Sequence, residues 1–251
     1  MQVPSRGDRR RRSRYWYRTA YCLGDDLRSV VDAVIDLLTH TFVFPMDAVR
    51  ARRAARRVSG PVRVSLGSGP MADRDWIGLD LEGGPSVFRA DVRRGLPFST
   101  GSVNAILAEH VLEHLFLDDL ASLLRECHRI LRPGCPIRIV CPDGLLVGQL
   151  INGHGDDRVQ AYLAFEESLH EFERDALLPL RAVNRLVYQW GDHRSLLTGA
   201  GVAHCLEAAG FNGVAVLSVD DSRYFQEIPD THVRTYPQSV HEAFAVEAIR
   251  S

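Results

Sequence analysis

The sequence predicts an α/β fold in which short apolar strands alternate with helices around a mostly parallel sheet. From residue 62 onward, runs of aliphatic and β-branched residues are separated by helical or glycine-rich segments, the alternation that produces parallel strands. The first run ends in a glycine-rich turn, Gly67-Ser68-Gly69. The length of 251 residues suits one sizeable domain with an extension or insertion.

The elements of this domain follow in order along the chain. Strands are expected at residues 62–66, 76–81, 87–90, 103–108, 136–141, 214–219 and 243–249. Helices are expected at 117–131 and at 196–209, and the second of these ends at Gly210. The mostly helical region 146–190 carries aromatic and acidic residues, which is typical of a lid or of an insertion that faces a substrate.

Two further helical stretches, at 25–40 and 45–58, precede the sheet, and Ser59-Gly60-Pro61 separates them from the first strand. The chain therefore divides into a flexible basic arm at 1–20, N-terminal helices at 21–60 and a main domain at 61–251. The N-terminal helices are placed either to cap the sheet or to pair with a second subunit, so a homodimer is one of the expected assemblies.

The composition is that of a soluble globular protein, with 45% hydrophobic and 25% charged residues. No apolar run approaches the roughly 18–20 residues that cross a bilayer, so no membrane partner is expected. The five cysteines lie far apart, are odd in number and form no CxxC pair. This usage favours reduced thiols in a cytoplasmic protein over a disulfide framework or a zinc cluster.

The basic charge is concentrated before Gly60. The run Arg9–Arg12, followed by Tyr15-Trp16-Tyr17 between further arginines, is a candidate contact for a nucleic acid or an acidic partner. Basic runs are more often solvated tails, however, and acid dominates the rest of the chain. The charge distribution therefore favours a small-molecule partner over a nucleic acid.

The glycine turn and the acid that follows it form the first candidate binding site. Glycines without Cβ atoms let a ligand approach the backbone, and Asp80, at the end of the next strand, can accept hydrogen bonds from two ribose hydroxyls. A dinucleotide site needs a third glycine and an acid about 20 residues further on. Here Met71 stands near the third-glycine position and Asp80 comes too early, which argues against NAD.

Six segments of the chain, taken in order, identify a family resemblance: VRVSLGSGP, WIGLDLEG, FRADVRRGLPF, VNAILAEHVLEHL, LLRECHRILRPG and PIRIVCPD. They resemble the successive motifs of class I S-adenosylmethionine-dependent methyltransferases, especially the methyltransferase type 11 group, over about residues 62–143. The resemblance implies a Rossmann-like, mostly parallel seven-stranded sheet with an antiparallel last strand. The short link from Gly69 to Trp76 is similar to a subgroup whose first crossover helix is almost lost.

The resemblance also implies S-adenosyl-L-methionine as the cofactor, with S-adenosyl-L-homocysteine as its product. Its implied binding residues are Leu66, Gly67, Ser68 and Gly69 at the methionine moiety, Asp80 at the ribose, Leu81, Asp91 and Val92 at the adenine, and Glu109 and His110 at the sulfonium. The alternative for Asp80 and Asp91 is a loop carboxylate that caps a turn. Two departures from the family pattern are Ser65, where an acid is common, and Cys135, which replaces a glycine.

Three histidines are candidates for the chemistry of transfer. His110, directly after the fourth strand, is the first candidate for a general base, and His193 is the second, with Asp192 to orient it. His114 fits a scaffold role. The spacing of His110, Glu113 and His114, together with His193, is also similar to divalent-metal clusters of some methyltransferases. Metal-free relatives carry Leu-Glu-His as well, so the sequence leaves a metal open.

The expected function is O-methylation, or N-methylation, of a small molecule such as a natural product or a sugar or glycan, by in-line transfer with a histidine base. One alternative is an enzyme that keeps the cofactor fold but catalyses a cyclisation or another non-methylating step. A second alternative is an RNA-binding methyltransferase, or a non-catalytic RNA binder, that uses the arginine arm. The variable region 146–190 is expected to form the acceptor pocket, so the sequence does not separate these functions.

Overall fold

The computed structural model describes residues 34–35, 37–70, 72–73, 75–84, 86–152, 156–170, 175–227 and 240–251. The chain forms two units, residues 1–46 and 47–251. The predicted arm at 1–20 and most of the predicted helix at 25–40 lie outside the described residues. In the first unit, the described residues before Thr39 are helical and continue into a π-helical turn, η1 (Thr39–Val43).

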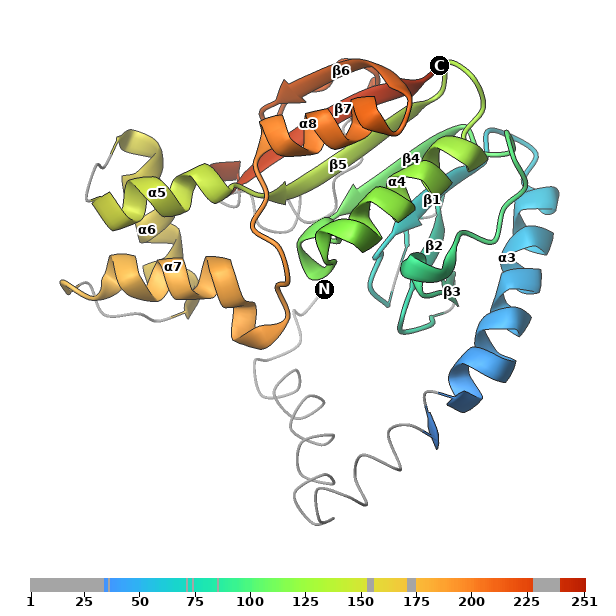
Figure 1. The fold of residues 1–251 in the computed structure, drawn as a ribbon, viewed down its shortest axis with the longest axis horizontal. Helices are drawn as coiled ribbons and strands as arrows, with labels where there is room; N and C mark the ends of the chain where they lie inside the picture. Colours follow the sequence, from blue (N-terminus) through green and yellow to red (C-terminus); the bar gives the residue numbers. More distant parts are fainter. Residues whose placement is uncertain are drawn as a thin grey trace. The chain divides into compact units, whose positions relative to one another are not determined.

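A seven-stranded sheet with the order β3-β2-β1-β4-β5-β7-β6 forms the centre of the second unit (Figure 1). Its strands are β1 (Arg63–Leu66), β2 (Ile77–Asp80), β3 (Val87–Arg89), β4 (Ala105–Glu109), β5 (Pro136–Pro142), β6 (Phe211–Leu217) and β7 (Ala243–Arg250). The first five strands run parallel, and β7 lies antiparallel between β5 and β6. The predicted mostly parallel sheet with a reversed last strand is therefore confirmed.

The link between β1 and β2 is a turn, and its described residues, 67–70, 72–73 and 75–76, contain no helix. The prediction of a nearly lost first crossover helix is therefore confirmed for these residues. The helix α3 (Phe44–Arg57) packs beside this part of the sheet, because Ala51 is fully buried in the main core. The buried carboxylate of Asp47 accepts a hydrogen bond of 3.0 Å from the Arg89 amide and so fixes α3 to the edge strand β3.

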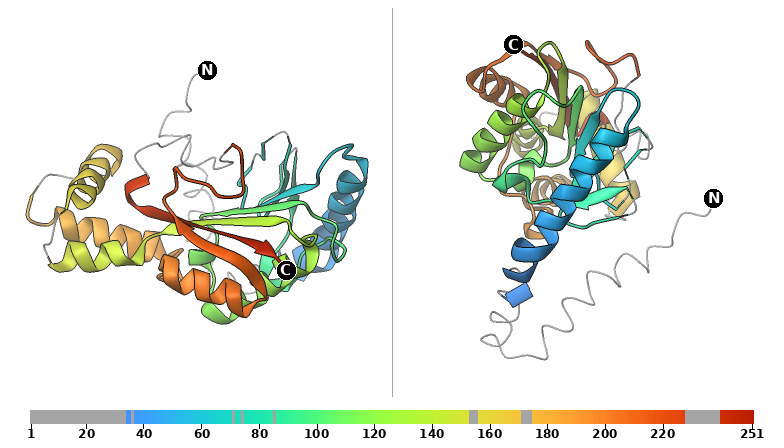
Figure 2. Two further views of the ribbon diagram at one scale, coloured as in Figure 1. Left: turned by 90° about the horizontal axis from the view of Figure 1, so that it is seen from above. Right: turned by 90° about the vertical axis from the view of Figure 1, so that its right-hand side faces the viewer.

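Two helices, α4 (Leu117–Ile130) and α8 (Gly199–Ala208), lie on one side of the sheet, as Figure 2 (left) shows from above. One face of α4 is buried against the sheet through Leu120, Leu123, Leu124, Cys127 and Ile130. The prediction that α8 begins at residue 196 was wrong. The Thr198 hydroxyl caps the helix by accepting a hydrogen bond from the Gly201 amide, so the helix begins at Gly199.

Three helices form a small subdomain after β5: α5 (Gly144–Asn152), α6 (Asp157–His170) and α7 (Leu178–Tyr188). The described residues of the region predicted at 146–190 are therefore mostly helical, and the role of this region as a lid or insertion stays a prediction. The subdomain, called the lid subdomain after that predicted role, has an apolar cluster of its own, made of Leu146, Val147, Leu150, Val159, Tyr162, Leu163, Phe165, Leu178, Ala182, Val183 and Leu186. No helix among the described residues is long and apolar enough to cross a membrane.

Buried charges join the lid subdomain to the end of the sheet. The Arg185 guanidinium on α7 donates hydrogen bonds to Glu166 on α6 and to Glu242, which directly precedes β7, and a third of 3.0 Å to the Tyr162 hydroxyl. Burial raises the pKa of Glu166 to about 7, although the positive charge of Arg185 acts in the opposite direction. Arg158 adds a second link, with its Nη1 2.8 Å from an Asp143 carboxylate oxygen.

A second buried ion pair lies inside the sheet itself. Arg138 on β5 stands directly opposite Glu247 on β7, and the two side chains, both fully buried, are joined at 2.8 Å. The arginine also donates to the Val219 and Asp221 carbonyls. Glu247 accepts from the Ser222 hydroxyl and from two further main-chain amides, so one pair organises both strands and the loop after β6.

We expect that Arg138→Ala lowers the free energy of unfolding by about 3–5 kcal/mol, because it leaves the Glu247 carboxylate buried without its charge partner. Urea unfolding followed by circular dichroism measures this loss. The control is Arg125→Ala on the exposed side of α4, with an expected change within about 0.5 kcal/mol. A loss below about 1 kcal/mol for Arg138→Ala would contradict the central role of the pair.

The raised pKa of Glu166 predicts a pH dependence of stability. The folded chain holds the Glu166 proton up to about pH 7, whereas the unfolded chain releases it near the ordinary value of 4.5. The folded state therefore binds more protons in this interval, and its stability falls as the pH rises. We expect the melting temperature to decrease across the interval, and to decrease less in Glu166→Gln. Equal slopes in wild type, Glu166→Gln and the exposed control Glu207→Gln would refute this.

Candidate functional site

The parallel strands bring the predicted site residues to one edge of the sheet. The turn after β1, the acid at the end of β2 and the histidine after β4 all stand at the carboxyl ends of neighbouring strands. Ligands of open α/β sheets bind at this edge.

The glycine turn has the backbone that only glycine adopts without strain. Gly67 and Gly69 have φ values of +62° and +63°. A Cβ atom on Gly67 would lie 2.4 Å from a methyl carbon of Val111, so this glycine lets the turn pack against the loop after β4. A Cβ atom on Gly69 would meet nothing within 4 Å, so open space lies beside this backbone. Leu66 is buried, whereas Ser68 is partly exposed at the turn.

Asp80 closes the glycine turn. One carboxylate oxygen accepts a hydrogen bond of 2.9 Å from the Gly69 amide, and the other accepts one of 2.8 Å from the Glu82 amide. Each oxygen has a second lone pair for another donor. The neighbouring Leu81 side chain is 61% exposed, so it presents an apolar surface beside the turn. This arrangement fits both a ribose-binding acid and the alternative of a carboxylate that caps a turn.

Asp91 is tied to its own loop more strongly. The side chain caps the short helix η2 (Val92–Arg94), and both of its oxygens accept hydrogen bonds of 2.8 Å from the Arg93 guanidinium. Burial raises the pKa of Asp91, but the hydrogen bonds and charge of Arg93 outweigh this, and the pKa lies below its ordinary value. An adenine contact by Asp91 and Val92 stays a prediction, and it requires Asp91 to share its oxygens with Arg93.

His110 follows Glu109 at the end of β4 in an uncommon backbone conformation, with φ of +53°. Its Nδ1 lies 3.1 Å from Glu113 Oε1. Since a carboxylate accepts, Nδ1 carries the proton and the lone pair of the neutral ring is on Nε2. Burial lowers the pKa of His110, but the Glu113 hydrogen bond and charge raise it above its ordinary value overall.

Glu113 joins two distant segments of the chain. It lies in the turn η3 (Leu112–His114), and its main-chain carbonyl accepts hydrogen bonds of 2.7 and 3.0 Å from the Arg194 and Ser195 amides. Its side chain is only 2% exposed. Burial raises the pKa of Glu113, but the hydrogen bond from His110 and its charge lower that pKa by a larger amount. The pKa of Glu113 therefore lies below its ordinary value.

Two details of the predicted histidine arrangement differ in the structure. The spacing of His110, Glu113 and His114 grouped these three residues with His193, but the left-handed backbone of His110 and the short η3 turn prevent an α-helix there. Instead, Glu113, His114 and His193 offer ligand atoms within 4.8 Å of one another. The Asp192 carboxylate was expected to orient His193, but the Leu186 carbonyl holds His193 Nδ1 at 2.7 Å, and the Asp192 side chain is exposed.

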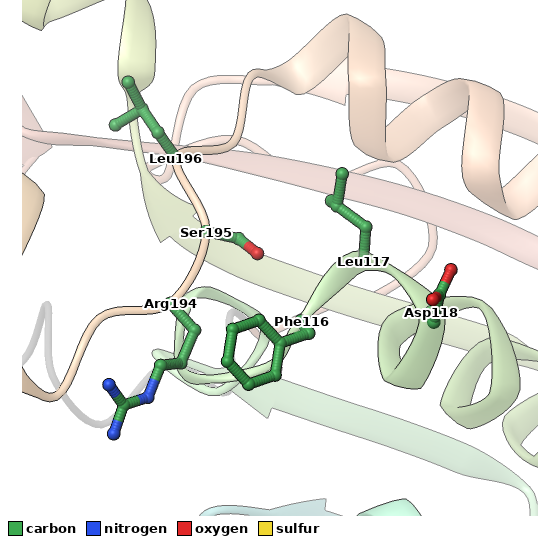
Figure 3. Close-up of a pocket in the computed structure, with 6 residues that line it drawn as sticks. All are labelled: Phe116, Leu117, Asp118, Arg194, Ser195 and Leu196. Atoms are coloured by element: carbon green, nitrogen blue, oxygen red, sulfur yellow. The ribbon is translucent and has the colours of Figure 1, made fainter.

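A groove opens between the loop after β4 and the segment that leads into α8 (Figure 3). Its volume is about 540 Å³, and it is lined by Phe116, Leu117, Asp118, Arg194, Ser195 and Leu196. Figure 3 shows the Phe116 ring beside the Arg194 side chain. No sequence pattern predicted this groove. One signal was available at Phe116, the N-cap of α4, where a polar residue usually stands. The Phe116 side chain forms no capping hydrogen bond.

Comparisons with known proteins add to this geometry. Residues 72–139 match the family model of a methyltransferase domain. No curated protein is significantly similar to the chain. Among solved structures, an S-adenosylmethionine-dependent methyltransferase from Archaeoglobus fulgidus is 16% identical, with 86% of this chain and 99% of that chain covered and a TM-score of 0.47. One from Mesorhizobium loti is 18% identical, with 79% and 96% covered and a TM-score of 0.45.

The two structural similarities are too distant to bear on the acceptor, and the family match is the stronger finding. It covers the strands from β2 to the middle of β5, and it includes Asp80, His110 and Glu113. Around this segment, the strand order and the reversed β7 are those that the motif resemblance implied. Residues 72–139 are therefore similar to a methyltransferase domain, and they lie within the fold that the motif resemblance implied.

Proposed function

We propose that the chain is an S-adenosylmethionine-dependent methyltransferase that acts on an oxygen or nitrogen atom of a small molecule, such as a natural product or a sugar, with His110 as the general base. The groove beside the carboxyl edge is the observation that carries the proposal. Its volume of about 540 Å³ lies within the range of small-ligand sites. It combines the exposed apolar side chains of Phe116, Leu117 and Leu196 with one cationic and one anionic residue, which fits a partly apolar, polar-substituted acceptor.

The groove is connected to the histidine through Glu113. The amides of Arg194 and Ser195, which line the groove, bond the Glu113 carbonyl, and the Glu113 carboxylate bonds His110. Hydrogen bonds through Glu113 thus connect the wall of the groove to the proposed base. An acceptor in the groove can present its hydroxyl or amine toward the end of β4, where the sheet places its other site residues.

The residues of the glycine turn fit the cofactor. The open space beside Gly69 leaves room for a ligand against the backbone, and Asp80 stands at the turn with lone pairs for ribose hydroxyls. Leu66, Gly67 and Ser68 would complete the methionine side of this site. Leu81, Asp91 and Val92 would provide the adenine side, and Glu109 and His110 would border the sulfonium. S-adenosylmethionine, when bound, supplies the methyl group.

The chain's own contribution to the reaction is alignment and proton removal. The groove must hold the acceptor atom about 3 Å from the methyl carbon and in line with the departing sulfur. Glu113 holds the His110 ring with Nδ1 protonated, so Nε2 can accept the proton that an acceptor hydroxyl loses. His193 stays a second candidate base, and its ring is held by the Leu186 carbonyl.

We expect S-adenosylhomocysteine to bind the wild type and Asp80→Ala to weaken the affinity by about 100-fold or more. Two hydrogen bonds to a charged group contribute about 1.5–3 kcal/mol each, and 1.4 kcal/mol corresponds to tenfold. Calorimetric titration measures both proteins. The matched control is Glu82→Ala, which removes an exposed acid two residues away and is expected to leave the affinity unchanged. Equal affinities for wild type and Asp80→Ala would exclude Asp80 as a binding residue.

We expect His110→Asn to lower kcat for a hydroxyl acceptor by about 10²–10⁴-fold. Asparagine tolerates the left-handed backbone of position 110, so the variant removes the base with little strain. Transfer of labelled methyl groups to a panel of hydroxylated and amine-bearing small molecules provides the assay, with RNA in the same panel. Transfer to RNA alone would refute the small-molecule assignment, and an unchanged kcat would refute the base.

A further inference from the structure

A candidate metal site lies beside the proposed base and requires neither the acceptor nor the cofactor. Glu113 and His114 are neighbours in the η3 turn, and His193 comes from the segment between η4 (Gln189–Gly191) and α8. One ligand atom from each of these three residues lies within 4.8 Å of the other two. The backbone fixes this approach, because the Arg194 amide donates to the Glu113 carbonyl at 2.7 Å.

Both histidines are held in the form that binds a metal. His114 Nδ1 lies 3.1 Å from the Asp192 carbonyl oxygen, and His193 Nδ1 lies 2.7 Å from that of Leu186. A carbonyl oxygen only accepts, so Nδ1 carries the proton in both rings and the lone pair is on Nε2. Metal-binding histidines usually donate their other ring N–H to a main-chain carbonyl or a carboxylate, which fixes the tautomer and the ring orientation.

Glu113 supplies the observation that points to a ligand independently of the cluster. The residue is only 2% exposed, and its Oε1 is occupied by His110. Its Oε2 is buried, and the described part of the chain offers it no strong side-chain donor, because the thiol of Cys141, which hydrogen-bonds the carboxylate, is a weak donor. A buried carboxylate oxygen with so weak a donor is poorly compensated for its desolvation, and a cation compensates it better.

We propose that Glu113, His114 and His193 bind one divalent transition-metal ion, with zinc as the best match. Two imidazoles and one carboxylate form the ligand set of zinc sites that keep an open position, whereas magnesium and calcium prefer oxygen ligands alone. Zinc bonds of about 2.0–2.2 Å set ligand atoms roughly 3.4 Å apart, so binding draws the three side chains together from their present separation. Glu113 then bridges the metal and His110.

The position of the site gives the metal one consequence. A bound ion would cross-link the loop after β4 to the segment that continues into the groove wall at Arg194 and Ser195. This consequence follows from the fold alone, so it holds whichever molecule accepts the methyl group.

The test uses the untagged full chain after dialysis against a chelator, titrated calorimetrically with zinc chloride. We expect one zinc per chain with submicromolar affinity, and an affinity at least about 100-fold weaker in His193→Ala. His204→Ala, which removes an exposed histidine on α8, is the matched control and should bind as the wild type does. His193 is partly exposed, so its variant is expected to fold even where Glu113→Gln does not, and circular dichroism checks both.

Cobalt substitution distinguishes this site from the cysteines. Cobalt bound by imidazole and carboxylate gives visible d–d bands without a thiolate charge-transfer band, and the d–d bands should disappear in His193→Ala. A thiolate band, less than stoichiometric zinc, or equal zinc affinity in wild type and His193→Ala would each overturn the assignment. Binding of S-adenosylhomocysteine, measured on the same samples, reports separately on the proposed function, so the two can fail independently.

Discussion

The arrangement of the candidate site at the carboxyl edge of the sheet depends on the hydrogen bonds of Glu113. Its carbonyl holds the segment that precedes α8, and its carboxylate holds the His110 ring. One buried residue thus positions the end of β4, the wall of the groove and a candidate base relative to one another. A buried carboxylate is stable only where hydrogen bonds and positive charge compensate its desolvation, so this geometry is constrained rather than adjustable.

The lid subdomain is attached to the sheet mainly by buried ion pairs. Its helices pack on one another through a separate apolar cluster, and buried charges join the subdomain to the sheet. Arg185 is placed between the carboxylates of Glu166 and Glu242, one from the lid and one from the start of β7. Ion pairs of this kind require a specific geometry, unlike apolar contacts, so the three side chains constrain the orientation of the subdomain.

The sequence was most informative where apolar periodicity and glycine determine the structure. All seven strands were predicted near their positions because their runs are short and apolar. The start of β6 was missed, because Asn212 and Gly213 interrupt the apolar pattern and a register irregularity follows Asn212, whereas the strand already begins at Phe211. The start of α8 was missed because apolar residues before Thr198 continue the helical pattern that the capping hydroxyl ends.

The candidate site was only partly predictable for a related reason. The glycine turn, Asp80 and His110 carry signals in their residue types, so the sequence identifies them as candidate site residues. The partners of the histidines carry no such signal, because main-chain carbonyls at Leu186 and Asp192 hold them. The same is true of the left-handed backbone of His110, which changed the set of side chains that converge. Periodicity reports on regular elements and not on the turns between them.

The ion pair between Arg138 and Glu247 also selects the register of the two strands that it joins. β7 lies between β5 and β6, so β6 joins the sheet only through β7. Arg138 on β5 carries a buried positive charge, which the Glu247 carboxylate on β7 neutralises. A slip by one residue would turn Glu247 to the opposite face. The pair therefore disfavours shifted registers of β7, and through β7 it also sets the position of the edge strand β6.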